Sequence, residues 1–165
     1  MKIYIDQSGK IEETAKPTAM AFTNSKTRSA LLPAKAKRRL QDQFRKIGEP
    51  KLFVVFIFAA LIYILIREDA RQTTEIVIDT EYPGKDTIIR KLLLQMLSER
   101  KSVDRPSVSF HQIGRSSMSH RIALTVHRGF KKADTLVTYK NMIEICMDTK
   151  KGYPALKYQV TMDKR

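Results

Sequence analysis

The stretch KIYIDQSG, residues 2–9, decides the fold because it is typical of a first β-strand that ends in a carboxylate. Ile3 and Ile5 fall on one face of this strand and Tyr4 on the other, the alternation expected of a half-buried strand. Asp6 ends the apolar alternation, and a Ser-Gly turn follows it. An acid at this position is a candidate for a site that the fold assembles, although an aspartate before Gln-Ser-Gly is also a good turn former.

Two further aspartates occupy similar places in the chain. Asp79 ends the apolar run at residues 76–78, and Asp134 lies in an amphipathic helical pattern near the C-terminus. Three carboxylates that are far apart in sequence, each at the edge of an apolar element, predict a metal site. Two alternatives remain open: Asp79 and Glu81 could cap the next helix, and Asp134 could be a solvated ion-pair partner of nearby lysines.

The net charge is strongly positive. The 165 residues include 31 Lys and Arg against 17 Asp and Glu, which gives a formal charge of +14. A field of this sign favours polyanions such as nucleic acid or an anionic membrane surface. Solubility alone does not need so large an excess, and we therefore expect a nucleic-acid partner.

One internal segment is apolar enough to raise the question of a membrane. Leu52 to Ile66 contains fifteen uncharged residues, which as a helix would measure about 22 Å against about 30 Å of hydrocarbon core. We interpret it as a buried core helix, with a small membrane-anchored protein as the less favoured alternative. The single cysteine, Cys146, lies in an apolar run and is expected in the core. The lack of disulfides and of a secretory signal at the start predicts a cytoplasmic location.

The periodicity of apolar residues predicts a mixed α/β fold. Three antiparallel strands are followed by alternating helices and strands, an order that implies a mixed sheet with helices packed on it. Residues 1–149 are expected to form one domain, and residues 150–165 a tail or an extra strand through Tyr158–Thr161. The expected elements are strands at 2–6, 18–23, 28–32, 75–79 and about 108–113, and helices at 34–47, 51–68, 85–100 and 120–147, the last interrupted near Gly129.

This order of elements resembles the ribonuclease H-like (integrase/resolvase) superfamily. Residues 4–9 are similar to the YID-x-SG start of an uncharacterised branch of those proteins, and residues 132–136 (KADTL) resemble the Ala-Asp-x-Leu with which many ribonuclease H helices carry their last ligand. His120 lies before that helix, where ribonuclease H proteins often have a mobile histidine. The resemblance covers residues 1–147 and implies a five-stranded sheet, with a three-stranded antiparallel meander and two parallel strands, flanked by helices.

The resemblance also implies a chemistry, which is hydrolysis of nucleic-acid phosphodiester bonds with two Mg²⁺ or Mn²⁺ ions. Asp6 would bridge both ions, while Asp79 and Asp134 would hold one each. Ribonuclease H itself adds a glutamate from its first long helix, which is apolar here, and Glu81 is the candidate substitute. His120 would move a proton or assist product release, unless it is merely an N-terminal helix residue. A catalytically degenerate nucleic-acid-binding protein on the same fold is the alternative.

Several basic residues are candidates for contacts with nucleic-acid phosphates. One set flanks Asp134, the proposed last ligand. A second set lies on the helix expected at residues 34–47, where a run of charges is also typical of a solvated face. One further lysine lies at the start of a helix. The candidates are Arg115, Arg121, Arg128, Lys131 and Lys132 in the first set, Lys35, Lys37, Arg38 and Arg39 in the second, and Lys85.

Overall fold

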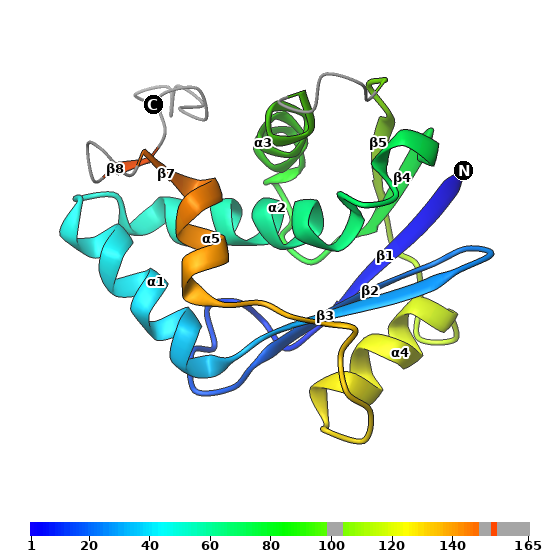
Figure 1. Ribbon diagram of the computed structural model, residues 1–165, viewed down its shortest axis with the longest axis horizontal. Helices are drawn as coiled ribbons and strands as arrows, with labels where there is room; N and C mark the ends of the chain where they lie inside the picture. The colour runs from blue at the N-terminus through cyan, green and yellow to red at the C-terminus, as the bar shows by residue number, and fades with distance from the viewer. Residues whose placement is uncertain (99–103, 149–152, 155–165) are drawn as a thin grey trace.

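A six-stranded mixed sheet forms the centre of the computed structural model, which describes residues 1–98, 104–148 and 153–154. Along the sheet the strand order is β5-β4-β1-β2-β3-β6 (Figure 1). The antiparallel meander and the parallel pairing of β4 and β5 confirm the expected ribonuclease H-like α/β arrangement. The short sixth strand was not predicted. The strands are β1 (Lys2–Ser8), β2 (Thr18–Thr23), β3 (Thr27–Leu32), β4 (Glu75–Asp79), β5 (Ser107–His111) and β6 (Thr135–Leu136).

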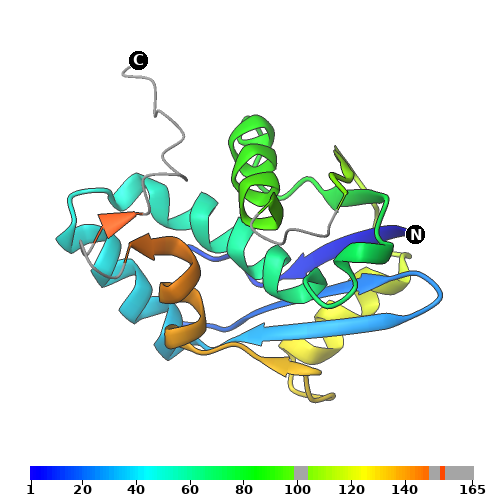
Figure 2. The same cartoon turned by 45° about the horizontal axis from the view of Figure 1, so that its top comes forward.

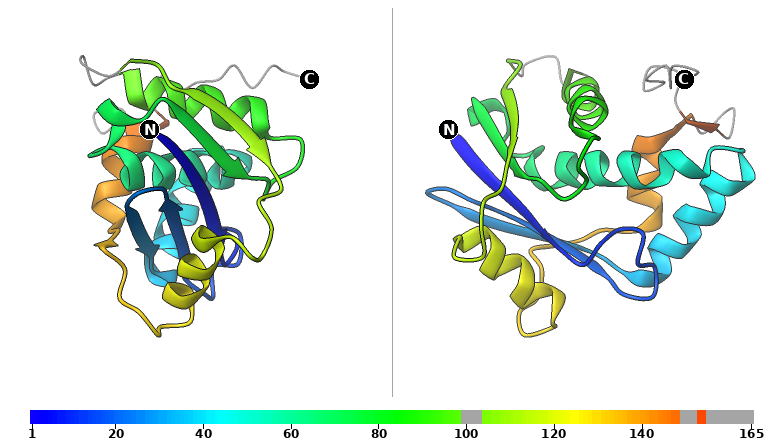
Figure 3. Two further views of the ribbon diagram at one scale, coloured as in Figure 1. Left: turned by 90° about the vertical axis from the view of Figure 1, so that its right-hand side faces the viewer. Right: turned by 180° about the vertical axis from the view of Figure 1, so that it is seen from behind.

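Helices lie on both sides of the sheet. In Figures 1 and 3, α4 lies on one side of the meander, and the long helix α2 lies on the other. Figure 2 shows α1 and α5 side by side next to α2, with α3 above it. The helices are α1 (Ala34–Lys46), α2 (Phe53–Ile66), α3 (Asp86–Ser98), α4 (Met118–His127) and α5 (Tyr139–Cys146), with 3-10 turns at Pro50–Leu52 and Ala70–Gln72 and a small ribbon of β7 (Met147–Asp148) and β8 (Tyr153–Pro154).

The apolar helix α2 is the centre of the hydrophobic core, as the sequence predicts. Twelve of its fourteen residues are buried. The ring of Phe44 on α1 packs at centroid distances of 6.1 Å from Phe53 and 5.8 Å from Phe56, and the buried Cys146 lies against the same helix. Among the described residues, no helix is both long enough and apolar enough to cross a bilayer.

The pleat of the sheet sorts the side chains of β1 between two environments. Ile3 and Ile5 are fully buried in the core cluster that includes α2. The alternation of side chains places Asp6 on the opposite face, which α4 covers. Asp6 pairs across the sheet with Ala21 of β2, and Ala21 pairs with Ser29 of β3. These three residues therefore share the face under α4.

The helical pattern at 120–147 is interrupted near Gly129, as the sequence predicts, but the interruption is longer than expected. Two helices form there, α4 and α5, and the connecting segment carries β6. Gly129, with φ of +79°, ends α4 in the left-handed conformation that favours glycine. Thr138 and Asn141 form a reciprocal capping box that begins α5. Asp134 consequently lies in the connecting segment and not in a helix. The predicted strand at Tyr158–Thr161 lies outside the described residues.

Candidate active site

Three carboxylates meet at the C-terminal ends of β1 and β4. Ile5 pairs in register with Ile78 of the parallel strand, so that Asp6 and Asp79, one residue further along, stand side by side. Glu81 follows two residues later, and one oxygen from each of the three side chains lies within 4.8 Å of the others. The carboxyl ends of parallel strands are a common place for ligand sites. The placement of Glu81 beside Asp79 agrees with the sequence-based expectation. We call Asp6, Asp79 and Glu81 the acidic group.

Burial and repulsion between neighbouring carboxylates raise the pKa values of Asp6 and Glu81. Asp6 is only 3% exposed, and burial followed by the nearby charge of Asp79 raises its pKa, while hydrogen bonds from Gln7 and His120 act in the opposite direction. Burial, together with the charges of Asp79 and Asp6, raises the pKa of Glu81 to about 7. Carboxylates this close repel one another unless a proton or a cation lies between them.

A histidine from α4 contacts the acidic group directly. The Nδ1 atom of His120 lies 3.0 Å from Oδ2 of Asp6. The contact follows from where α4 begins, because the Ser117 hydroxyl accepts a hydrogen bond of 3.1 Å from the backbone N–H of His120 and caps the helix. Asp6 thus contacts a side chain of the first turn of α4, the end of a helix near which negative charge is favourable. His120 lies in the first turn of α4, in agreement with the sequence-based expectation that a helix begins there.

Asp79 is held by the loop that follows β5. Its Oδ1 atom accepts a hydrogen bond of 2.7 Å from the backbone N–H of Ile113, and Thr80 donates to the carbonyl of His111 at 3.0 Å. These contacts fix the orientation of the carboxylate from the side of β5. The alternative that Asp79 caps the next helix is not supported, because α3 begins seven residues later, at Asp86.

Asp134 is bound elsewhere, at the far edge of the sheet. Its Oδ2 atom accepts hydrogen bonds from the backbone N–H of Ser29 at 2.8 Å and from the Ser29 hydroxyl at 3.2 Å. Its own N–H donates to the Ser29 hydroxyl at 3.1 Å. Ser29 is two strands away from Asp6, which corresponds to about 10 Å across the sheet. The structure does not bring Asp134 to Asp6 and Asp79, whereas it places Glu81 beside them.

Most of the predicted phosphate-contact residues are on the surface, in separate regions. Arg115 in the loop before α4 and Arg121, which follows His120 in sequence, are exposed. Arg39 stacks on the ring of Tyr139 with its guanidinium carbon 3.9 Å from the centroid. The other exposed candidates are Arg128, Lys131 and Lys132 beyond the far end of α4, Lys35 and Arg38 on α1, and Lys85 before α3.

Lys37 is an exception, because its side chain is buried. Its ammonium group donates to the carbonyl oxygens of Lys10 at 2.9 Å and Glu13 at 2.8 Å, and to the hydroxyl of Thr18 at 3.0 Å. The predicted role of Lys37 in a nucleic-acid grip is therefore wrong. It fastens α1 to the loop between β1 and β2.

A pair of hydrogen bonds to the Tyr82 hydroxyl, close to the site, was not predicted from the sequence. The Tyr82 hydroxyl accepts hydrogen bonds of 3.0 Å from the Gln7 side-chain amide and from the backbone N–H of Ile11. Because Tyr82 follows Glu81, these bonds tie the segment that carries Glu81 to the end of β1. The contacts join residues more than seventy positions apart, which periodicity and local motifs do not reveal.

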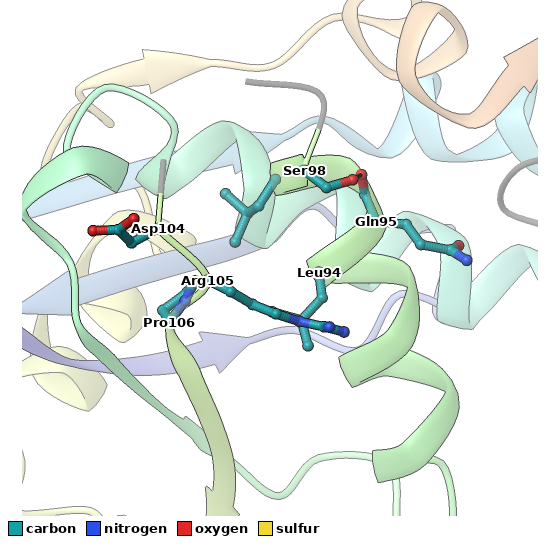
Figure 4. A pocket seen from close by; sticks show the side chains of 7 residues that line it. Leu94, Gln95, Ser98, Asp104, Arg105 and Pro106 are labelled. Carbon is teal, nitrogen blue, oxygen red and sulfur yellow. Dashed lines mark hydrogen bonds between the residues drawn. The ribbon is translucent and has the colours of Figure 1, made fainter. Parts of the chain in front are cut away.

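A separate hollow of about 220 Å³ lies between the end of α3 and the start of β5 (Figure 4). The Arg105 side chain extends from the β5 side toward α3 in this view. No member of the acidic group lines the hollow, whose walls are Leu94, Gln95, Leu97, Ser98, Asp104, Arg105 and Pro106.

Comparison of the chain with protein-family models, curated proteins and solved structures gave no match. The likeness to ribonuclease H-like proteins therefore rests on the order and direction of the strands. The candidate site rests on the alignment of Asp6 with Asp79 on neighbouring parallel strands.

Proposed function

We propose that this chain binds divalent metal at the acidic group and hydrolyses phosphodiester bonds of nucleic acid there. The observation that carries the proposal is the side-by-side placement of Asp6 and Asp79 at the ends of neighbouring parallel strands, with Glu81 within 4.8 Å. A turn-forming or capping aspartate needs no such partner. Three converging carboxylates, one of them buried, are costly to a fold unless they serve a positively charged ligand.

The donor set fits Mg²⁺ or Mn²⁺. All three candidate ligands are carboxylate oxygens, which these hard cations prefer. Burial, and after it the charge of the neighbouring carboxylates, raises the pKa values of Asp6 and Glu81, and a bound divalent cation would favour the charged carboxylates. When bound, such a cation supplies a more acidic water and neutralises charge on the leaving oxygen of a phosphodiester.

His120 is the residue suited to proton transfer. Its Nδ1 atom lies 3.0 Å from Oδ2 of Asp6, a contact that orients the ring. Nε2 is the ring nitrogen that Asp6 does not engage, and it can exchange a proton with the attacking water or the leaving oxygen. The side chain of His120 is 26% exposed, so that solvent can restore its proton between turnovers.

Nucleic acid is the polyanion that best matches the charge of the chain. The formal charge is +14, and a cluster of carboxylates would repel phosphates without surrounding cations. Arg115 and Arg121 are exposed and lie close in sequence to Ile113 and His120, which contact the acidic group, and they are the candidates to hold the nucleic-acid backbone.

Binding without cleavage is a second candidate. One observation favours it: Asp134 is absent from the acidic group and is bound to Ser29 instead, which leaves three carboxylates where the resemblance implies four acids. Such a protein would bind nucleic acid and leave it intact.

A cleavage assay separates the two candidates. Labelled RNA, DNA, RNA–DNA hybrid and branched substrates are incubated with the full chain in Mg²⁺ or Mn²⁺, beside the Asp6→Asn variant. Asp42→Asn is the matched control, because Asp42 is an exposed aspartate on α1. Metal-dependent cutting that Asp6→Asn abolishes and Asp42→Asn retains supports the nuclease. Tight binding without cutting by the wild-type protein supports the second candidate.

A further inference from the structure

A groove in the sheet surface adjoins the acidic group. The helix α4 packs over β1, β2 and β3, with His120 above Asp6, and it leaves the earlier part of β1 uncovered on that face. There the surface is hollowed by a groove of about 280 Å³, lined by Lys2, Tyr4, Glu75, Val77, His111, Gln112 and Ile113.

The groove and the acidic group belong to one continuous face. Tyr4 precedes Asp6 by two residues and Val77 precedes Asp79 by two, so each pair shares one side of its strand at a separation of about 7 Å. Tyr4 and Val77 also pair with each other across β1 and β4. A nucleic-acid strand that passes the acidic group and runs along β1 and β4 would therefore reach the groove about 7 Å further on. This distance is comparable with the length of one sugar–phosphate unit.

The lining of the groove is suited to a flat, uncharged ring. Tyr4 is 39% exposed and offers aromatic surface, and the largely buried Val77 forms part of the groove wall beside it. The only formal charges of the lining cancel, because the Lys2 ammonium lies 3.0 Å from a carboxylate oxygen of Glu75. The Lys2 ammonium also lies 5.5 Å from the centre of the Tyr4 ring, so that it adjoins the surface on which a base would stack. A phosphate has no net positive partner here, whereas a nucleobase has both a stacking surface and polar groups for its edges.

We infer that this groove binds an unpaired nucleobase, that of the nucleotide next to the phosphate at the acidic group, so that the preferred substrate is single-stranded at that point. The inference rests on the proposed function and goes beyond it by naming the substrate class. A base inside a duplex is stacked on both faces and paired along its edge, and it reaches Tyr4 only if it leaves the helix. Tyr4 is in this account a specificity residue, distinct from the acidic group.

The test measures binding separately from cleavage. Fluorescence anisotropy with the full chain in EDTA compares labelled single-stranded and fully duplex oligonucleotides. Tyr4→Thr removes the ring but keeps a β-branched residue that suits a strand, and Tyr4→Phe keeps the stacking surface. Phe130→Thr is the matched control, because Phe130 is an exposed aromatic, 81% accessible, outside the groove. Circular dichroism and thermal melting verify that each variant is folded.

We expect Tyr4→Thr to weaken single-strand binding by roughly 5- to 150-fold, the loss typical of one stacking aromatic, with duplex binding unchanged. Tyr4→Phe and Phe130→Thr should bind like the wild type. An oligonucleotide carrying 5-bromouridine should cross-link to the peptide that contains Tyr4. If the wild type binds single strands and Tyr4→Thr binds them equally well, the groove inference is overturned while the proposed function stands. If the wild type binds no nucleic acid, both fail.

Discussion

Asp6 and Asp79 stand side by side because Ile5 of β1 pairs with Ile78 of β4, one residue earlier on each strand. This register is a property of the whole sheet, since a slip of one residue would turn either carboxylate into the opposite face. The apolar partners that fix the register are buried under α2, while the acids face α4. The same packing that stabilises the core therefore positions the candidate site.

His120 is expected to matter for cleavage and not for metal affinity. In the His120→Ala variant the proposed proton transfer is lost, and the cleavage rate should fall by about 100-fold or more. Binding of Mn²⁺ should persist, because the three carboxylates remain. Single-turnover rates and titration calorimetry measure the two effects separately. A variant that cuts at the wild-type rate would remove His120 from the mechanism.

Asp134 is expected to act on stability alone. The Asp134→Ala substitution removes the acceptor of the buried Ser29 N–H, and an unsatisfied buried donor costs about 1–3 kcal/mol. Urea unfolding would measure the loss. The control is Asp42→Ala, which removes an exposed carboxylate 3.8 Å from Arg45 and should change stability by less than about 1 kcal/mol. Loss of Mn²⁺ affinity in a folded Asp134→Ala protein would contradict our placement of this residue.

Gly9 lies where a side chain would clash with its neighbours, and Gly48 provides a control in which only the backbone conformation matters. Both Gly9 and Gly48 have positive φ, +82° and +76°. A Cβ atom at Gly9 would lie 2.5 Å from the carbonyl oxygen of Pro17 and 2.8 Å from Nε2 of His127, whereas nothing lies within 4 Å at Gly48. Gly48→Ala should cost only the backbone strain, about 1–2 kcal/mol. Gly9→Ala should cost about 1–3 kcal/mol more because of overpacking. If both substitutions lower the free energy of unfolding equally, the loop around Gly9 adjusts to the added methyl group and the clash has no energetic effect.

The parts of the fold that depend on local periodicity were predictable from sequence. The alternation around Ile3 and the uninterrupted apolar run of α2 gave the right element types, because each pattern reflects burial of that segment alone. Asp79 and Glu81 could be assigned to the same side for the same reason, since they are two residues apart on an extended chain. Confirmation of their contact with Asp6 required the pairing of β1 with β4.

The errors concern places where two signals compete. The break near Gly129 was predicted, but the apolar spacing concealed its length, which extends to the Thr138 capping box at the start of α5. Asp134 was consequently assigned to a helix. The burial of Lys37 could have been predicted, because Leu40 and Phe44 lie three and seven residues later on the apolar stripe of α1. The exposed basic residues next to Lys37 in sequence obscured this pattern. The contact of His120 with Asp6 depends on the Ser117 cap, a signal that local sequence also contains.

The buried Lys37 predicts a specific dependence of stability on pH. Burial lowers its pKa from the ordinary 10.5 to about 8 in the folded protein. Between these values the unfolded chain binds more protons than the folded one, so this residue's contribution becomes more favourable as pH rises from about 8 to 10.5. Urea unfolding at pH 7.5 and pH 10 should show wild type gaining stability relative to Lys37→Met. The exposed Lys35→Met substitution should show no such change, and a pH-independent difference for Lys37→Met would contradict the shift.

The central claim is that Asp6, Asp79 and Glu81 together bind a divalent cation. Titration calorimetry of Mn²⁺ into the full chain tests it most directly, with Asp79→Asn as the site variant and Asp42→Asn as the exposed control. We predict saturable binding by the wild type and by Asp42→Asn, and at least about tenfold weaker binding by Asp79→Asn. Absence of saturable binding by the wild type, or equal affinity in Asp79→Asn, would contradict the account.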